Sequence, residues 1–226
     1  MVKNGMSEDV QIKSKQRVTN HGEVFTGKRE INAMLDMVKQ ETERLDSRFL
    51  EPACGTGNFL VEILRRKLAV LKDKYAKNQA DYEHYGVIAA SSIYGVDLLP
   101  DNVLECQERL NGIFVMEYTA LFSVLNQQCL AAIKYLFSKN ILCGDALNMR
   151  TENGKPIVFS EWAMVGDNKM QRRDFTLSDI LEANKKSPQL TLMQGLMKYD
   201  RDAGTFIPNP VREYPLVPYW EIMNYE

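Results

Sequence analysis

The stretch that begins at Phe49 constrains the fold of this chain of 226 residues more than any other. Phe49-Leu50-Glu51 has the pattern of a short strand, Gly55-Thr56-Gly57 that of a tight turn, and Asn58 begins a helical pattern. Glycine lacks a Cβ, so the turn can bend sharply and a ligand can approach its backbone. The helix that follows offers free N–H groups to such a ligand. By spacing alone, the turn also fits an ordinary strand–helix junction with Glu51 as a surface carboxylate.

Two further acidic residues follow predicted strands. Asp97 ends the apolar segment 93–96, and Asp145 follows the segment 140–144. Because a parallel α/β sheet binds ligands at the carboxyl ends of its strands, Glu51, Asp97 and Asp145 are expected at one ligand-binding edge. An acidic residue that ends the second strand of such a sheet accepts hydrogen bonds from ribose hydroxyls, which indicates that role for Asp97. The alternative for Asp97 and Asp145 is capping of a helix or a turn.

Apolar residues at helical spacing predict helices over residues 30–44, 58–77 and 117–138, with another helix starting at Pro100. Residues 78–92 are interpreted as a loop with a short apolar piece. The positive run on the second of these helices is interpreted as a solvated face; it comprises Arg65, Arg66, Lys67, Lys72 and Lys74. Alternating strands and helices predict an α/β fold with a doubly wound, mostly parallel sheet and helices on both faces.

One domain is expected over residues 22–185. A mobile N-terminal arm (residues 1–21) precedes it, and an extended C-terminal arm rich in proline and tyrosine (residues 186–226) follows it. The net charge of −2 and the pI near 5.9 argue against a large built-in DNA-binding surface. Four cysteines without C-x-x-C spacing and only two histidines indicate reduced cysteines, no metal site and a cytoplasmic location.

The residue identities in and around the glycine turn are more specific than the spacing of its glycines. Glu51-Pro52-Ala53-Cys54-Gly55-Thr56-Gly57-Asn58-Phe59 closely resembles the cofactor-binding motif of adenine-N6 DNA methyltransferases of restriction–modification systems. Gly22-Glu23-Val24-Phe25-Thr26-Gly27 resembles the motif that precedes this turn in the family, with Gly27 in place of the usual proline. Asn140-Ile141-Leu142-Cys143-Gly144-Asp145-Ala146-Leu147 resembles the third cofactor element. Together these motifs cover residues 22–148.

The resemblance implies a Rossmann-like methyltransferase fold with S-adenosyl-L-methionine as cofactor and no metal. It places the methionine part of the cofactor against the glycine turn and the preceding motif, which gives Phe25, Thr26, Glu51, Pro52, Ala53, Cys54, Gly55, Gly57, Asn58 and Phe59 as binding residues. A carboxylate at Glu51 suits a ligand that carries an ammonium and a sulfonium. Asp97 would hold the ribose, Leu98 would cover the adenine ring, and Asp145 and Ala146 would meet the edge of that ring. Phe25 as plain core is the alternative.

The chain departs from the family where catalysis is expected. Adenine methyltransferases carry Asn/Asp/Ser-Pro-Pro-Tyr/Phe, whose polar group and carbonyl accept hydrogen bonds from the target amine while the ring stacks on the flipped base. No such tetrapeptide occurs here. The expected strand at residues 156–159 is followed by Ser160-Glu161-Trp162, so Ser160 and Trp162 are the candidate catalytic residues. The alternatives are that this strand starts a β-hairpin and that Trp162 only packs.

The function expected from the resemblance is an S-adenosylmethionine-dependent DNA methyltransferase of the adenine-N6 type that is incomplete alone. Its expected partners are DNA and a second protein chain that supplies target recognition. The alternative is a catalytically inactive methyltransferase-like module that binds cofactor or a partner chain. A third possibility is methylation of another substrate.

Overall fold

The structure is a computed structural model that describes residues 26–185 and 210–225, together with Arg17 and Thr19. Residues 1–16, 18, 20–25, 186–209 and 226 lie outside the described residues. They include most of the expected N-terminal arm and the predicted binding residue Phe25.

A parallel sheet of three strands lies at one end of the helices. Its strands are β1 (Phe49–Glu51), β2 (Ile93–Asp97) and β3 (Ile141–Cys143), in the order β1-β2-β3. The register pairs Glu51 with Gly95 and Asp97 with Cys143. The prediction of an α/β chain with a parallel sheet is therefore confirmed at this coarse level.

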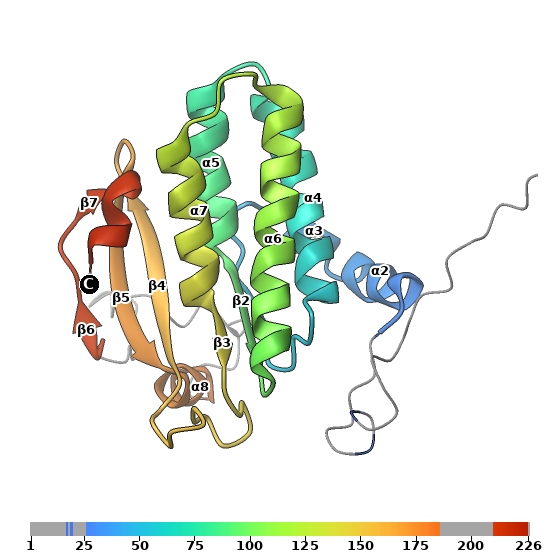
Figure 1. Cartoon of the computed structure of the whole chain (residues 1–226), viewed down its shortest axis with the longest axis vertical. Helices are drawn as coiled ribbons and strands as arrows, with labels where there is room; N and C mark the ends of the chain where they lie inside the picture. The colour runs from blue at the N-terminus through green and yellow to red at the C-terminus, as the bar shows by residue number, and fades with distance from the viewer. Residues whose placement is uncertain (1–16, 18, 20–25, 186–209, 226) are drawn as a thin grey trace, which may run out of the picture.

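Four of the described helices are long and stand side by side, and their lower parts flank this sheet (Figure 1). The described helices are, in chain order, α2 (Lys28–Asp36), α3 (Lys39–Thr42), α4 (Asn58–Tyr75), α5 (Gln79–Ser91), α6 (Pro100–Leu121), α7 (Gln127–Asn140) and α8 (Leu177–Lys185). The side chains of Asn78 and Asn126 accept hydrogen bonds from the first turns of α5 and α7, which fixes where these helices begin. None of the helices among the described residues is long and apolar enough to cross a membrane.

Two of the expected helices are divided, and one expected loop is helical. The predicted helix 30–44 is split into α2 and α3, and the predicted helix 117–138 is split between the end of α6 and α7. The segment 78–92, interpreted as a loop, is mostly α5, whose Tyr82, Val87 and Ala90 are fully buried. Because the polar residues of α5 gather in its first half and the apolar residues in its second half, its sequence lacks the one-sided pattern that identifies a surface helix.

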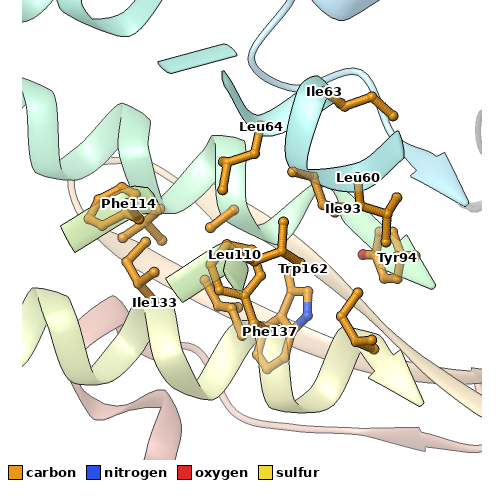
Figure 2. Packing of buried hydrophobic residues seen from close by; sticks show 14 of the residues in the cluster. Leu60, Ile63, Leu64, Ile93, Tyr94, Leu110, Phe114, Ile133, Phe137 and Trp162 are labelled. Carbon is orange, nitrogen blue, oxygen red and sulfur yellow. The ribbon is translucent and has the colours of Figure 1, made fainter. Parts of the chain in front are cut away.

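The two faces of β2 meet different layers. On one face, a Cβ added at Gly95 would lie 2.9 Å from a methyl of Leu60, so α4 packs closely on the strand. On the other face, the ring of Tyr94 meets Phe159, a residue of the second sheet described below, edge-on with ring centroids 5.6 Å apart. Figure 2 shows Leu60 and Tyr94 within the same apolar cluster as the inner side chains of the helices.

A second, antiparallel sheet packs against the first. It consists of β4 (Val158–Val165), β5 (Lys169–Thr176), β6 (Arg212–Glu213) and β7 (Val217–Pro218), and a 3-10 helix, η2 (Tyr219–Asn224), follows it. The loop between β4 and β5 contains Gly166 and Asn168 with positive φ and is too short for a parallel crossover. The hairpin alternative for this segment is therefore the observed one, and β4 does not extend the parallel sheet.

Residues 210–225 cover the outer edge of β5 and one side of α7. The backbone N–H of Tyr214 donates to the carbonyl of Arg172 at 3.0 Å, and the N–H of Tyr219 donates to the carbonyl of Asn168 at 2.8 Å. The hydroxyl of Tyr225 donates to the carbonyl of Met170 at 2.9 Å. This segment therefore pairs with β5 through backbone hydrogen bonds and is held by buried aromatic side chains.

Candidate functional site

The carboxyl edge of the parallel sheet brings the predicted carboxylates onto one side of the molecule. Glu51 ends β1, Asp97 ends β2, and Asp145 follows β3 by two residues. The N–H of Gly144 donates to the carbonyl of Asp97 at 2.9 Å, which continues the strand pairing to the start of the Asp145 loop. All three acidic residues are half-buried.

The glycine turn is tied to β2 by two hydrogen bonds. The N–H of Cys54 donates to the carbonyl of Val96 at 2.9 Å, and the N–H of Gly55 donates to Oδ2 of Asp97 at 2.9 Å. Gly55 and Gly57 have φ values of 53° and 88°, in a backbone region that residues other than glycine rarely adopt. The turn therefore requires these two glycines and is held against the end of the neighbouring strand.

Asp97 lies at the carboxyl edge of the sheet and also caps the loop before α6. Its Oδ1 accepts from the N–H of Leu99 at 2.9 Å and from Nδ2 of Asn102 at 3.1 Å, while Oδ2 accepts from Gly55. These three donors come from the loop before α6, from α6 itself and from the glycine turn. The capping alternative is therefore present, and of the four acceptor sites that a carboxylate has, about one remains, on Oδ2.

Glu51 is held less tightly than Asp97. Its Oε1 accepts from the N–H of Ala53 at 3.3 Å. Burial raises the pKa of Glu51, and the hydrogen bond from Ala53 partly opposes that shift. Pro52 and Ala53 are exposed, so the opening residues of the turn face solvent beside this carboxylate.

The space beside Gly57 is filled by the protein itself. A Cβ at Gly57 would lie 2.5 Å from Sγ of Cys106, so its absence lets α6 approach the turn. From the sequence, this glycine was expected to make room for a ligand and not for α6. A hydrogen bond with Cys106, together with burial, raises the pKa of the Cys54 thiol, which lies behind the turn and is also buried.

Arg109 supports the turn from α6 and was not identified from the sequence. Its Nη1 donates to the carbonyl of Thr56 at 2.6 Å, to Oγ1 of Thr56 at 3.0 Å and to Oδ1 of Asn58 at 2.9 Å. The side chain of Asn58 is thus directed to Arg109, while Phe59 packs partly buried against the core. An arginine among the polar residues of an amphipathic helix carries no signal in the sequence that distinguishes this contact.

The segment that was predicted to be the third cofactor element forms a tight turn. Oδ1 of Asp145 accepts from the N–H of Leu147 at 2.8 Å and of Asn148 at 3.2 Å, and Oδ2 accepts from Nδ2 of Asn148 at 2.6 Å. Asp145 thus caps its own turn, the second of its two predicted roles. Beside it Ala146 is half-buried, and Leu98, at the end of the neighbouring strand, is 56% exposed. Thr26 is exposed just before α2.

The candidate catalytic residues lie in the interior. Ser160 and Trp162 are 3% and 4% exposed, and Figure 2 shows Trp162 in the core. Oγ of Ser160 donates to Asp174 at 2.8 Å, and Nε1 of Trp162 donates to Oδ1 of Asn140 at 2.8 Å. Both side chains are therefore engaged within the protein, and the packing alternative for Trp162 matches its surroundings.

Lys67 is fully buried, so its interpretation as part of a solvated face is wrong. It follows Leu64 by three residues and precedes Leu71 by four, which places it on the apolar side of α4. Its Nζ donates to the carbonyls of Arg44, Leu45 and Ser47 at 2.9, 3.0 and 2.6 Å and to Oγ of Ser92 at 2.8 Å. Burial lowers the pKa of Lys67 to about 7. The ammonium thereby fixes the chain that enters β1.

Within the described part of the chain, no three histidine, cysteine, aspartate or glutamate side chains gather as a metal site would require. Comparisons of the sequence with protein-family models and with curated proteins, and of the chain with solved structures, found no match.

Proposed function

We propose that this chain binds S-adenosylmethionine at the carboxyl edge of its parallel sheet, as the cofactor-binding portion of an adenine-N6 DNA methyltransferase. The observation that carries the proposal is the hydrogen bond from Gly55 to Asp97. It joins a turn of two positive-φ glycines to the carboxylate that ends the next strand. In doubly wound sheets these two parts hold the ends of a nucleoside ligand.

The residues at this edge fit such a ligand. Oδ2 of Asp97 has one acceptor site left for a ribose hydroxyl, and the exposed Leu98 offers an apolar surface to the adenine ring. Glu51, beside the exposed Ala53, is the carboxylate for the ammonium and sulfonium of the methionine part. When bound, S-adenosylmethionine supplies an electrophilic methyl group on its sulfonium. The chain's own residues would bind and orient it.

The burial of Ser160 and Trp162 favours a second candidate function. A residue that accepts a hydrogen bond from a target amine, or a ring that stacks on a flipped base, has to be reachable by the substrate. Both side chains are buried and bonded to Asp174 and Asn140. We therefore propose, as the alternative, a module that binds cofactor and depends on a second protein for the acceptor loop and for DNA contacts.

Calorimetric titration with S-adenosylmethionine and with its demethylated product tests the shared part of both proposals. We expect one site per chain and a ligand-dependent rise in the melting temperature. Absence of binding to the folded protein would reject both. A methyl-transfer assay on duplex DNA then separates the two functions, because turnover by the chain alone supports the enzyme, and turnover only with an added protein supports the module.

A further inference from the structure

Arg17 joins the candidate site from a distant part of the sequence. Its Nη1 donates to Oδ2 of Asp101 at 2.6 Å, and its Nη2 donates to Oδ1 of Asp101 at 3.3 Å and to Oδ1 of Asn102 at 3.1 Å. Asp101 and Asn102 lie in the first turn of α6, immediately after the loop that Asp97 caps. The guanidinium thus spans two neighbouring side chains at the start of the helix.

The contact with Asn102 leads on to Asp97. Asn102 is 1% exposed, and its Nδ2 donates to Oδ1 of Asp97 at 3.1 Å. A side-chain amide has an acceptor at one end and a donor at the other, so the partner of one end determines what the other end presents. Because Arg17 offers only donors, it engages the amide oxygen and leaves the NH₂ group directed to the carboxylate.

We infer that Arg17 is a positioning residue for the ligand site, acting on Asp97 through the amide of Asn102. The inference rests on the proposed function and deepens it. Asp97 is held by Gly55 on one oxygen and by Leu99 and Asn102 on the other, so the loss of Asn102 as a donor leaves Oδ1 with the bond from Leu99 alone and loosens the carboxylate. The site then depends on a residue that lies 80 positions before Asp97 in the sequence.

The ion pair between Arg17 and Asp101 by itself would not affect the position of the Asp97 carboxylate. The side chains of Arg17 and Asp101 are 24% and 56% exposed, and exposed ion pairs of this kind contribute little. A purely superficial role for Arg17 therefore predicts small changes in stability and none at Asp97. The relay through Asn102 predicts a change at Asp97 itself, which separates the two roles.

The first measurement needs no ligand. Side-chain amide and carboxyl resonances are recorded by NMR for the wild type, Arg17→Ala and the control Arg29→Ala, which changes an exposed arginine on α2. We expect Arg17→Ala to shift the Asn102 side-chain amide and the Asp97 carboxyl signals and Arg29→Ala to leave both in place. Unchanged signals in a folded Arg17→Ala protein would overturn the inference, whether or not any ligand binds.

The second measurement is the affinity for the demethylated cofactor product. We expect Arg17→Ala and Asn102→Ala each to raise the Kd about three- to tenfold, and the double variant to raise it no further than the larger single change. Arg17→Lys should recover part of the loss, because lysine keeps a charged donor without the fork of the guanidinium. Additive losses would overturn the relay. If the wild type binds no cofactor while the NMR shifts occur, the proposed function fails and the link from Arg17 to Asp97 remains.

Discussion

The backbone N–H of Gly55 lies 2.9 Å from Oδ2 of Asp97, so the turn after β1 and the end of β2 form one unit. Neither residue is placed independently of the other. A ligand that contacts this edge meets a turn whose shape depends on the carboxylate and a carboxylate whose orientation depends on the turn.

Replacement of Asp97 by alanine should weaken binding of S-adenosylmethionine roughly ten- to hundredfold, because ligand hydroxyls lose a charged acceptor worth about 1.5–3 kcal/mol. Calorimetric titration measures the effect. Asp73→Ala, which removes an exposed carboxylate on α4, is the matched control and should bind like the wild type. Equal affinity of the Asp97 variant and the wild type would show that the ligand, if bound, lies elsewhere.

Replacement of Gly57 by alanine should destabilise the fold itself. The positive φ costs about 1–2 kcal/mol, and the contact of the new Cβ with Cys106 adds about 1–3 kcal/mol of overpacking. Gly154→Ala is the control, since Gly154 has φ of 72° but no atom within 4 Å of its Cβ position. Denaturant unfolding should give a larger loss for Gly57→Ala than for Gly154→Ala. Equal losses would mean that Cys106 moves aside freely.

Truncation of Trp162 should act on stability rather than directly on a substrate. Trp162→Ala removes a buried ring and leaves Oδ1 of Asn140 without its indole donor, so we expect a loss of about 3–5 kcal/mol in the free energy of unfolding. Trp162→Phe keeps most of the volume and should cost less. If Trp162→Phe remains as stable as the wild type but loses methyl transfer, the ring has a role in catalysis that its burial does not indicate.

The buried Lys67 should make stability depend on pH. The folded protein releases this proton near pH 7, whereas an unfolded lysine holds it to about pH 10.4. Between these values the unfolded chain binds more protons, so the contribution of Lys67 to the free energy of unfolding rises with pH, by at most about 1.4 kcal/mol per pH unit.

Denaturant unfolding of the wild type and of Lys67→Met from pH 7 to pH 10 isolates this effect. The free energy of unfolding of the wild type, relative to that of Lys67→Met, should rise as the pH rises. Lys72→Met, an exposed lysine on the same helix, should show no such trend. A constant difference for Lys67→Met would indicate that the four surrounding oxygens keep the proton on the amine.

The parts of the structure that were predictable depend on local pattern. β1, β2 and β3 were recognisable because each is a short apolar run that ends in a polar or glycine-containing turn. The glycine turn and Asp97 were found together because both occur at strand ends, where a parallel sheet gathers its ligand-binding groups.

The remaining features depend on contacts between residues far apart in the sequence. The sequence does not distinguish Lys67 from the other lysines of the basic run. Only the fold brings the carbonyls of residues 44, 45 and 47 around its amine. Ser160 was predicted as a candidate catalytic residue, and its partner Asp174, on the opposite strand of a hairpin, could not be identified from the sequence. Arg17 and Arg109 reach the site from other elements, and nothing in their own neighbourhoods indicates where they point.

The pairing of residues 210–225 with β5 has a consequence for biosynthesis. These residues are translated after the strand that they cover, and at about 5–20 residues per second the interval lasts several seconds. During that interval the nascent chain presents the unpaired N–H and C=O groups of the β5 edge, which is the kind of surface on which other chains add strands. Early termination of translation would leave that edge permanently open, so products that stop before residue 210 should be more prone to aggregate than the longer chain.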